Sequence, residues 1–318
     1  DEFENAITLH TMVHEQLINF YRGFRRDAHP MAIMVGVVGA LSSFYPDSTN
    51  INDPYERLVA SRRLIAKIPT IAAMAYKYSL GQPFNYPQND LSYAENFLHM
   101  CFSVPAEKYK IDPIISKAMD RILILHADHT FNASTFTARV CASTMSDIFS
   151  CVVAAIGSLK GPLHGGANEA AMEMIENWTT RDEAREKTLG MLANKGKIMG
   201  FGHAIYSERD PRNAIIKEFS KELSLEYGDD SLYQVSEEVE KVMWDEKKLF
   251  PNADFFHASA YFYLGIPTKL FTPIFVMSRV TGWTAHCMEQ RANNRIIRPS
   301  ADYTGPESSV WVDLEDRE

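Results

Sequence analysis

The chain has 318 residues, of which 46% are hydrophobic and 23% are charged. This composition can bury a large core, which excludes a disordered or low-complexity protein and leaves one large domain or two smaller ones. The 32 Lys and Arg against 41 Asp and Glu give a net charge of -9. Such a balance disfavours nucleic acid and a membrane surface as partners, so an anionic substrate would need a local basic pocket.

Helical periodicity dominates the chain, and alternating runs typical of strands are nearly absent. We expect a polar loop at residues 47–53, chain breaks at 81–83 and 86–87, and a capped helix start at 179–182. The uncharged run 31–45 is too short to cross a bilayer, which takes about 20 apolar residues. The apolar spacing predicts helices in three long segments, 58–78, 113–125 and 232–250.

The cysteines lie far apart, without a CxxC pair, in stretches that otherwise have the composition of a core. We interpret Cys101, Cys141, Cys151 and Cys287 as buried thiols of a reducing compartment and expect a cytoplasmic protein. The N-terminus lacks the pattern of a secretory signal, and because the chain does not begin with Met we expect a fragment.

Residues 126–129 (HADH) place two histidines three positions apart. This spacing would suit a metal if a third ligand lay nearby, but no HExxH motif or Cys/His cluster accompanies it. We therefore favour hydrogen bonding for His126 and His129 and expect no metal site.

A glycine-rich elbow at residues 161–166 (GPLHGG) carries His164 between two helical segments. Pro162 would end the first helix, and Gly165 and Gly166 permit close backbone approach before the second. The positive end of a helix dipole opposes protonation, so we expect a neutral imidazole that can donate a hydrogen bond to a developing enolate. The alternative is a histidine that only caps a tight turn.

A second elbow at residues 200–203 (GFGH) carries His203 and is followed by Asp210-Pro211, a helix start with Arg212 in its first turn. A guanidinium and a helix dipole together can hold a carboxylate. The alternative is a solvated arginine at an ordinary helix start. Arg279 interrupts the apolar run 270–280 with no Asp or Glu within a helical turn, so its anionic partner is a remote protein group or a ligand carboxylate.

Asp254 is a lone carboxylate between a Pro-Asn turn and aromatic residues, in 250–256 (FPNADFF). Apolar surroundings raise the pKa of a carboxyl group and make it a better general base. The alternative is that Asp254 caps a helix that begins at Phe255.

Four motifs in order resemble the citrate synthase family: 161–170 (GPLHGGANEA), 199–212 (MGFGHAIYSERDPR), 251–254 (PNAD) and 296–305 (IIRPSADYTG). Helical segments in 10–96 resemble the large domain of bacterial hexameric-type citrate synthases. From residue 132 onward the chain is more similar to 2-methylcitrate synthases, although FNASTFTARV is also shared with small dimeric citrate synthases. Family members usually carry a further segment before the position of Asp1.

The resemblance implies condensation of an acyl-CoA, which is a substrate, with oxaloacetate, followed by thioester hydrolysis and without a cofactor. In that reaction Asp254 would remove the α-proton, His164 would stabilise the enol, and His203 would protonate the oxaloacetate carbonyl. His129, Arg212 and Arg279 would bind oxaloacetate. Arg298 would reach the site of a neighbouring subunit, which implies a homo-oligomer, at least a dimer, with shared active sites.

The family also places coenzyme A over the second elbow, where backbone groups recognise adenine. The residues at those positions are Met199, Gly200, Phe201 and Gly202. Several relatives have a basic residue four positions after the catalytic histidine, for the phosphates, but this chain has Ser207 there. Arg209, Lys195 and Lys197 are the candidates that could replace it.

We therefore expect a mostly α, two-domain fold, with a large helical domain of residues 1–162 and 270–318 and a small catalytic, CoA-binding domain of residues 163–269. Closure of the small domain over oxaloacetate would exclude water. Propionyl-CoA is the favoured acyl donor, because the catalytic half resembles 2-methylcitrate synthases, and acetyl-CoA is the alternative. A citryl-CoA lyase-type module would normally carry a nucleotide-binding or phosphohistidine module that these residues lack. A non-catalytic helical scaffold leaves Arg279 and both elbows unexplained.

Overall fold

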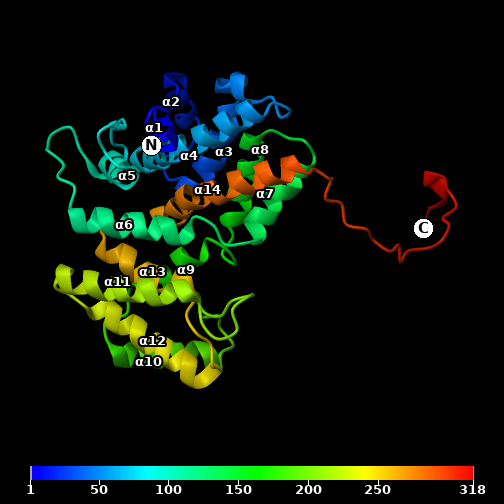
Figure 1. Cartoon of the computed structure of the whole chain (residues 1–318). Helices are drawn as coiled ribbons and strands as arrows, with labels where there is room; N and C mark the ends of the chain where they lie inside the picture. Colours follow the sequence, from blue (N-terminus) through cyan, green and yellow to red (C-terminus); the bar gives the residue numbers. More distant parts are fainter. Residues whose placement is uncertain (1, 318) are drawn as a thin grey trace.

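A computed structural model describes residues 2–317 and is mostly helical (Figure 1). Within those residues no strand is formed, and Phe201 and Pro251 make one isolated antiparallel bridge. The predicted mostly α fold is thereby confirmed. The helices are α1 (Glu2–Thr8), α2 (Glu15–Tyr21), α3 (Pro30–Phe44), η1 (Pro46–Ser48), α4 (Pro54–Leu80), α5 (Tyr93–Phe102), α6 (Pro113–His126), α7 (Ala133–Ser143), α8 (Ile148–Leu159), α9 (Ala167–Ile175), α10 (Arg181–Ala193), α11 (Pro211–Tyr227), α12 (Ser231–Lys247), α13 (Ala253–Tyr263), η2 (Thr268–Leu270), α14 (Phe271–Ala292) and η3 (Leu314–Asp316).

One two-residue signal, Asp followed by Pro, starts α4, α6 and α11. In each case the Asp side chain accepts a hydrogen bond from the second helical N–H, and Pro occupies the first position, where an N–H would have no partner. The three predicted helices correspond to α4, α6 and α12, although α4 begins earlier and α12 ends earlier than expected. The expected loop at 47–53 includes the short 3-10 helix η1.

The helices form two groups that meet around α6, α9, α13 and α14 (Figure 1). In the first group α14 packs against α3, α4, α7 and α8, and its buried side chains include Trp283 and Arg279. In the second group α11 packs on α13, α10 on α12, and α13 on α9. No helix among residues 2–317 has the length and hydropathy needed to cross a membrane.

Residues 293–317 form an exposed tail that leaves the body of the protein (red in Figure 1) and contains only the short helix η3. Most of its apolar side chains are exposed, among them Val310 and Trp311. The only described contact over the Trp311 ring comes from the tail itself, where the Arg317 guanidinium lies 4.8 Å from the ring centre.

The thiols lie mainly inside the first group of helices. Cys101, Cys151 and Cys287 are buried and Cys141 is half-buried, and all four are free. Burial raises the pKa of the Cys101 thiol. A hydrogen bond to Cys151, together with burial, raises the pKa of Cys141. The expectation of buried thiols therefore holds for three of the four.

Candidate active site

A cavity of about 630 Å³ opens where the two groups of helices meet. It is lined by both glycine-rich elbows, by side chains from the ends of α6, α11 and α13, and by side chains of α14. Every site residue that the sequence predicts lines this cavity, except Arg298, which is exposed on the C-terminal tail. The residues it brings together are His129, His164, His203, Arg212, Asp254, Arg279, Met199, Gly200, Phe201 and Gly202.

His164 lies on the turn between α8 and α9, and α8 ends at Leu159, before Pro162. Gly165 is required there, because a Cβ at this position would lie 2.5 Å from the Leu159 side chain. Burial, with smaller contributions from the charges of Arg279 and His129, lowers the pKa of His164 to about 4. The imidazole is therefore neutral at physiological pH, mainly because it is buried.

The proton of neutral His164 can be assigned from its partner Ser134, at the start of α7. The Ser134 N–H, which can only donate, lies 3.4 Å from His164 Nε2, and the Ser134 hydroxyl lies 2.8 Å from it. The Trp283 indole N–H donates to the same hydroxyl at 3.1 Å. Since Nε2 is the acceptor, Nδ1 carries the proton and can donate it to a ligand.

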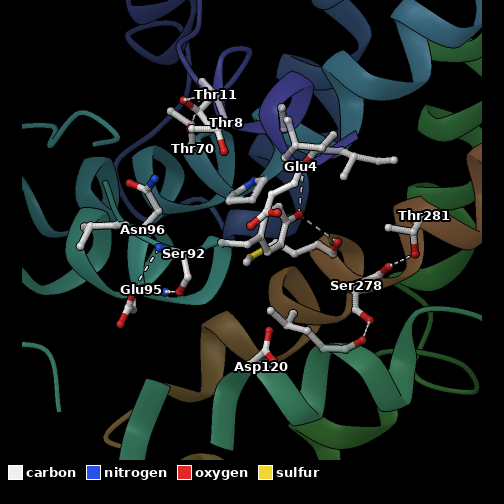
Figure 2. Close-up of a pocket in the computed structure, with 18 of the residues that line it drawn as sticks. Glu4, Thr8, Thr11, Thr70, Ser92, Glu95, Asn96, Asp120, Ser278 and Thr281 are labelled. Atoms are coloured by element: carbon white, nitrogen blue, oxygen red, sulfur yellow. Dashed lines mark hydrogen bonds between the residues drawn. The ribbon is translucent and has the colours of Figure 1, made fainter. Parts of the chain in front are cut away.

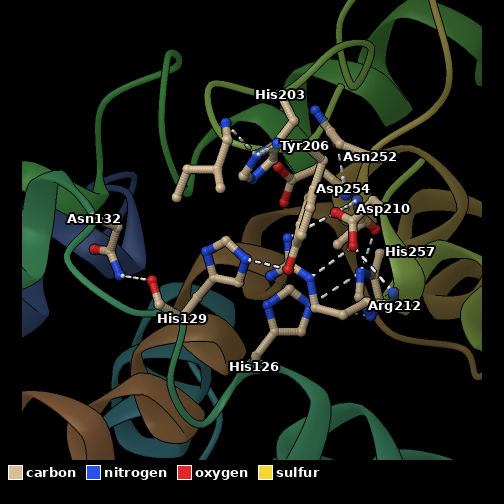
Figure 3. Close-up of polar contacts among 12 residues, drawn as sticks. His126, His129, Asn132, His203, Tyr206, Asp210, Arg212, Asn252, Asp254 and His257 are labelled. Carbon is tan, nitrogen blue, oxygen red and sulfur yellow. Dashed lines mark hydrogen bonds and ion pairs between the residues drawn. The ribbon is translucent and has the colours of Figure 1, made fainter. Parts of the chain in front are cut away.

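His203 has the opposite arrangement. Its Nδ1 accepts hydrogen bonds from the N–H groups of Ile205, at 3.0 Å, and Tyr206, at 3.3 Å. Burial lowers the pKa of His203, so the neutral ring carries its proton on Nε2. The His203 ring lies 5.1 Å from that of His129, whose Nε2 contacts the Tyr206 hydroxyl at 3.0 Å (Figure 3).

Arg212 is in the first turn of α11, as expected, but it is not solvated. Its Nε donates to Asp210 Oδ1 at 3.0 Å, and its Nη2 donates to Asp210 Oδ2 at 2.7 Å. The sequence predicts that this guanidinium binds a ligand carboxylate, but two of its N–H groups bind Asp210 at the start of the helix. A ligand carboxylate would have to bind the rest of the guanidinium group.

Arg279 is 1% exposed in the middle of α14. Its Nε donates to the His126 carbonyl oxygen at 2.7 Å, and its guanidinium lies 4.9 Å from the centre of the Phe275 ring. Burial lowers the pKa of Arg279 to about 10, so the side chain stays charged at neutral pH. The structure gives it no ion pair with any described carboxylate.

Asp254 is the second residue of α13, which begins at Ala253 and is capped by Asn252, whose side-chain oxygen accepts from the Asp254 N–H at 3.0 Å. The alternative in which Asp254 caps a helix from Phe255 is therefore wrong. The Oδ1 atom of Asp254 is buried and has no hydrogen-bond partner. Burial raises the pKa of Asp254 to about 7, against the opposing charges of Arg212 and Arg279.

The second elbow lies directly on the turn that precedes Asp254. The Gly200 carbonyl accepts from the Asn252 N–H at 2.9 Å, and the Gly202 N–H donates to the Phe250 carbonyl at 2.9 Å. Gly200 has a φ of +81°, and a Cβ there would lie 2.8 Å from Phe255 Cβ. Only glycine allows this contact. Of the three candidate basic residues, Lys197 lines the cavity, whereas Lys195 and Arg209 do not.

The remaining histidine of the 126–129 motif is buried and makes hydrogen bonds. His126 Nε2 lies 3.1 Å from His257 Nδ1 and 3.2 Å from His257 Nε2. No group of three or more His, Cys, Asp and Glu side chains within residues 2–317 is arranged to hold a metal ion.

A larger cavity, of about 740 Å³, lies elsewhere, among α1, α4, α5, α6 and α14 (Figure 2). Its polar lining consists of carboxylates such as Glu4 and Asp120 and hydroxyls such as Thr8 and Thr281. None of the described residues that line it is Lys, Arg or His. It is thus unsuited to a dicarboxylate substrate and contains none of the predicted site residues.

Sequence reasoning did not single out Ser134, Tyr206 or Asp210, which contact His164, His129 and Arg212 respectively. Asp210 was identifiable only as a helix start, since its side chain also performs that ordinary task. Ser134 lies within FNASTFTARV, but its contact with a histidine 30 positions away leaves no local pattern.

The family model for the citrate synthase C-terminal domain matches residues 1–300. The chain belongs to the citrate synthase family. It is 55% identical over 296 residues to the 2-methylcitrate synthase of Shewanella oneidensis, an alignment that covers 92% of this chain and 76% of that protein.

Solved structures of the family are similar over nearly the whole chain. A citrate synthase from Pyrobaculum aerophilum matches with a TM-score of 0.88 and 39% identity, covering 99% of this chain and 81% of that one. A citrate synthase from Thermoplasma acidophilum, solved as a ternary complex with carboxymethyl coenzyme A and oxaloacetate, matches with a TM-score of 0.90 and 29% identity, covering 99% of this chain and 83% of that one.

Proposed function

We propose that this protein is a 2-methylcitrate synthase, which condenses propionyl-CoA with oxaloacetate and then hydrolyses the thioester. The observation that carries the proposal is the meeting of one buried carboxylate and two neutral histidines in a single cavity that also contains two arginines. The 55% identity to the Shewanella oneidensis 2-methylcitrate synthase supports the choice of acyl donor. The similar Thermoplasma acidophilum citrate synthase, solved as a ternary complex with carboxymethyl coenzyme A and oxaloacetate, supports the choice of substrate classes.

In this proposal Asp254 removes a proton from the α-carbon of propionyl-CoA. A carboxyl with a pKa of about 7 is half ionised at neutral pH and is a stronger base than an exposed Asp. The Nδ1–H of His164 donates to the thioester oxygen and stabilises the enol. A neutral imidazole has one N–H and can make this hydrogen bond without being protonated first.

The new carbon–carbon bond forms between the α-carbon and the ketone carbon of oxaloacetate. As the ketone oxygen gains charge, the Nε2–H of His203 supplies its proton, and the product carries a hydroxyl at that carbon. Water then hydrolyses the thioester and releases coenzyme A. Exclusion of bulk water before this step protects the enol.

Oxaloacetate binding is assigned to His129, Arg212 and Arg279, with Arg298 supplied by a neighbouring subunit. Two guanidinium groups in one cavity form the local basic pocket that a chain of net charge -9 needs for a dicarboxylate. Coenzyme A is assigned to the turn at Met199, Gly200, Phe201 and Gly202. Its phosphates are assigned to Lys197, because that side chain lines the cavity.

The proposal includes a homo-oligomer with shared sites and a cytoplasmic location, for which the exposed apolar tail and the free thiols are the respective support. It also includes the division into residues 1–162 with 270–318 and residues 163–269. The packing of α9 to α13 mainly on one another supports that division.

The test is a steady-state comparison of propionyl-CoA and acetyl-CoA with oxaloacetate, following release of free thiol. We expect a higher kcat/KM for propionyl-CoA, with acetyl-CoA accepted more slowly, since one methylene in an apolar pocket is worth about 10- to 200-fold. A higher kcat/KM for acetyl-CoA would make the protein a citrate synthase, and no thiol release with either would overturn the activity itself.

A further inference from the structure

We propose that Asp210 and His257 are positioning residues that orient the catalytic base by holding the two peptide groups of Ala253, the residue before Asp254. The inference rests on the proposed function, in which Asp254 is the base. Neither residue is needed as an acid or base in that reaction, and both are buried beside the site (Figure 3).

The need for positioning follows from the Asp254 side chain itself. Its Oδ1 is buried without a hydrogen-bond partner, so little besides the backbone determines where the carboxylate points. The Asp254 N–H is held by the Asn252 side chain at 3.0 Å. The orientation of the base therefore depends on how the first turn of α13 is anchored.

Two buried side chains provide that anchor from opposite sides of Ala253. The Ala253 N–H donates to Asp210 Oδ2 at 3.0 Å. The Ala253 carbonyl lies 2.5 Å from His257 Nδ1 and, because a carbonyl can only accept, that nitrogen carries a proton. Ala253 and His257 are both buried, as is Asp210.

The first anchor continues to Arg212. The carboxylate of Asp210 that accepts from Ala253 also accepts from Arg212 Nε and Nη2, at 3.0 and 2.7 Å. A shift of this guanidinium toward a ligand carboxylate would therefore bear directly on Asp210 and on the start of α13.

The second anchor continues to Arg279. Burial lowers the pKa of His257 to about 3, so the ring is neutral and its Nε2 is an acceptor. His126 Nε2 lies 3.2 Å away and donates to it. The backbone carbonyl of His126 in turn accepts from Arg279 Nε at 2.7 Å. The residue before the base is thus linked to both arginines assigned to oxaloacetate, by two independent routes through buried polar groups.

The test uses Asp210→Asn and His257→Leu, measured at saturating oxaloacetate with propionyl-CoA carrying hydrogen or deuterium at the α-carbon. We expect kcat to fall about 10²-fold, as a small misplacement of a reacting group does. The KM for propionyl-CoA should change little, and the deuterium isotope effect on kcat should rise because proton removal becomes slower than the other steps. His257→Gln, which keeps a donor for the Ala253 carbonyl, should recover part of the loss.

Ser259→Ala is the matched control, because Ser259 lies on the same helix and its hydroxyl makes a buried hydrogen bond to Ser220 at 2.7 Å, remote from Ala253. It should leave kcat and the isotope effect unchanged. Circular dichroism and thermal melting establish that each variant is folded, and if His257→Leu does not fold, His257→Gln and Asp210→Asn decide the question.

Folded variants that keep wild-type kcat, or that lose kcat with an unchanged isotope effect, would show a merely structural role and overturn the inference. If Asp254→Asn is inactive while these variants behave as wild type, only this inference fails. If Asp254→Asn is active, the base assignment in the proposed function fails as well.

Discussion

The Nε atom of Arg279 donates to the carbonyl oxygen of His126 at 2.7 Å, while no described carboxylate forms an ion pair with the guanidinium. A buried charge without a counter-ion destabilises the folded protein. An anionic ligand that pairs with Arg279 offsets this desolvation penalty and therefore stabilises the protein when it binds. Oxaloacetate at 100 times its Kd should therefore stabilise the folded protein by about 2.7 kcal/mol, which appears as a higher melting temperature. In Arg279→Met this shift should be largely lost. An unchanged shift would show that oxaloacetate does not use Arg279.

Asp254→Asn should abolish condensation while oxaloacetate binding is retained, because the change removes the base and leaves the arginines in place. Loss of the base should reduce kcat by about 10³-fold or more, at the upper end of what general base catalysis contributes. Steady-state kinetics measure the loss, and the thermal shift with oxaloacetate is the control for binding. Retention of more than about a tenth of the wild-type kcat would exclude Asp254 as the base.

The pH dependence follows from the raised pKa of Asp254, about 7. The base acts when ionised, so kcat/KM should rise with pH and level off above about 7. Folding stability should change in the opposite sense. Because the folded pKa exceeds the ordinary value of 3.8, the contribution of Asp254 to stability is fully present below that value and is lost as the pH rises through about 7.

Asp254→Asn cannot ionise, so its melting temperature relative to the wild type should increase between pH 4 and pH 8. Melting curves of the two proteins across this range provide the measurement. A difference in melting temperature that stays constant with pH would mean that the folded protein does not raise the pKa of Asp254.

Arg298→Ala and Asp254→Asn should complement each other if the tail supplies Arg298 to a neighbouring subunit. Each variant alone should be inactive, whereas a mixed dimer has one site free of both changes. Mixing the variants under conditions where subunit exchange is verified should restore part of the activity. If no activity returns, Arg298 does not act across subunits.

Gly200→Ala should destabilise the protein, because the residue has a φ of +81° and a Cβ there would lie 2.8 Å from Phe255 Cβ. Backbone strain of this kind costs about 1 to 3 kcal/mol. Gly190→Ala is the matched control: Gly190 lies in α10 with open space around it, and the change should stabilise the helix by up to about 1 kcal/mol. Chemical denaturation compares the two. Equal effects would contradict the close approach at Gly200.

Local signals in the sequence predict most of the fold, and fewer of the contacts in the site. Asp-Pro pairs and apolar spacing are enough for α4, α6 and α11, because they act within one helical turn. The sequence does not reveal the pairing of Arg212 with Asp210, although the two are close in sequence, since the same Asp also caps the helix. The links from His164 to Ser134 and from His126 to His257 depend on how distant helices pack, which no short pattern encodes.

The start of α13 illustrates the same limit at closer range. Both Asn252 and Asp254 are good caps by residue type, and only the backbone decides that Asn252 caps the helix and Asp254 faces the cavity. The motif around Arg298 does not predict that this residue is exposed on the tail. The same sequence could pack against its own chain or against another subunit.

The buried thiols bear on how the enzyme is assayed. Coenzyme A release is followed with disulfide reagents that react with thiolates. Burial raises the pKa of the Cys101 thiol, and Cys101, Cys151 and Cys287 are all buried away from such a reagent. The folded protein should therefore add little background to the colour that its product generates. Once denatured, each chain exposes four reactive thiols. The same reagent, used without substrate, therefore measures the rate of global unfolding.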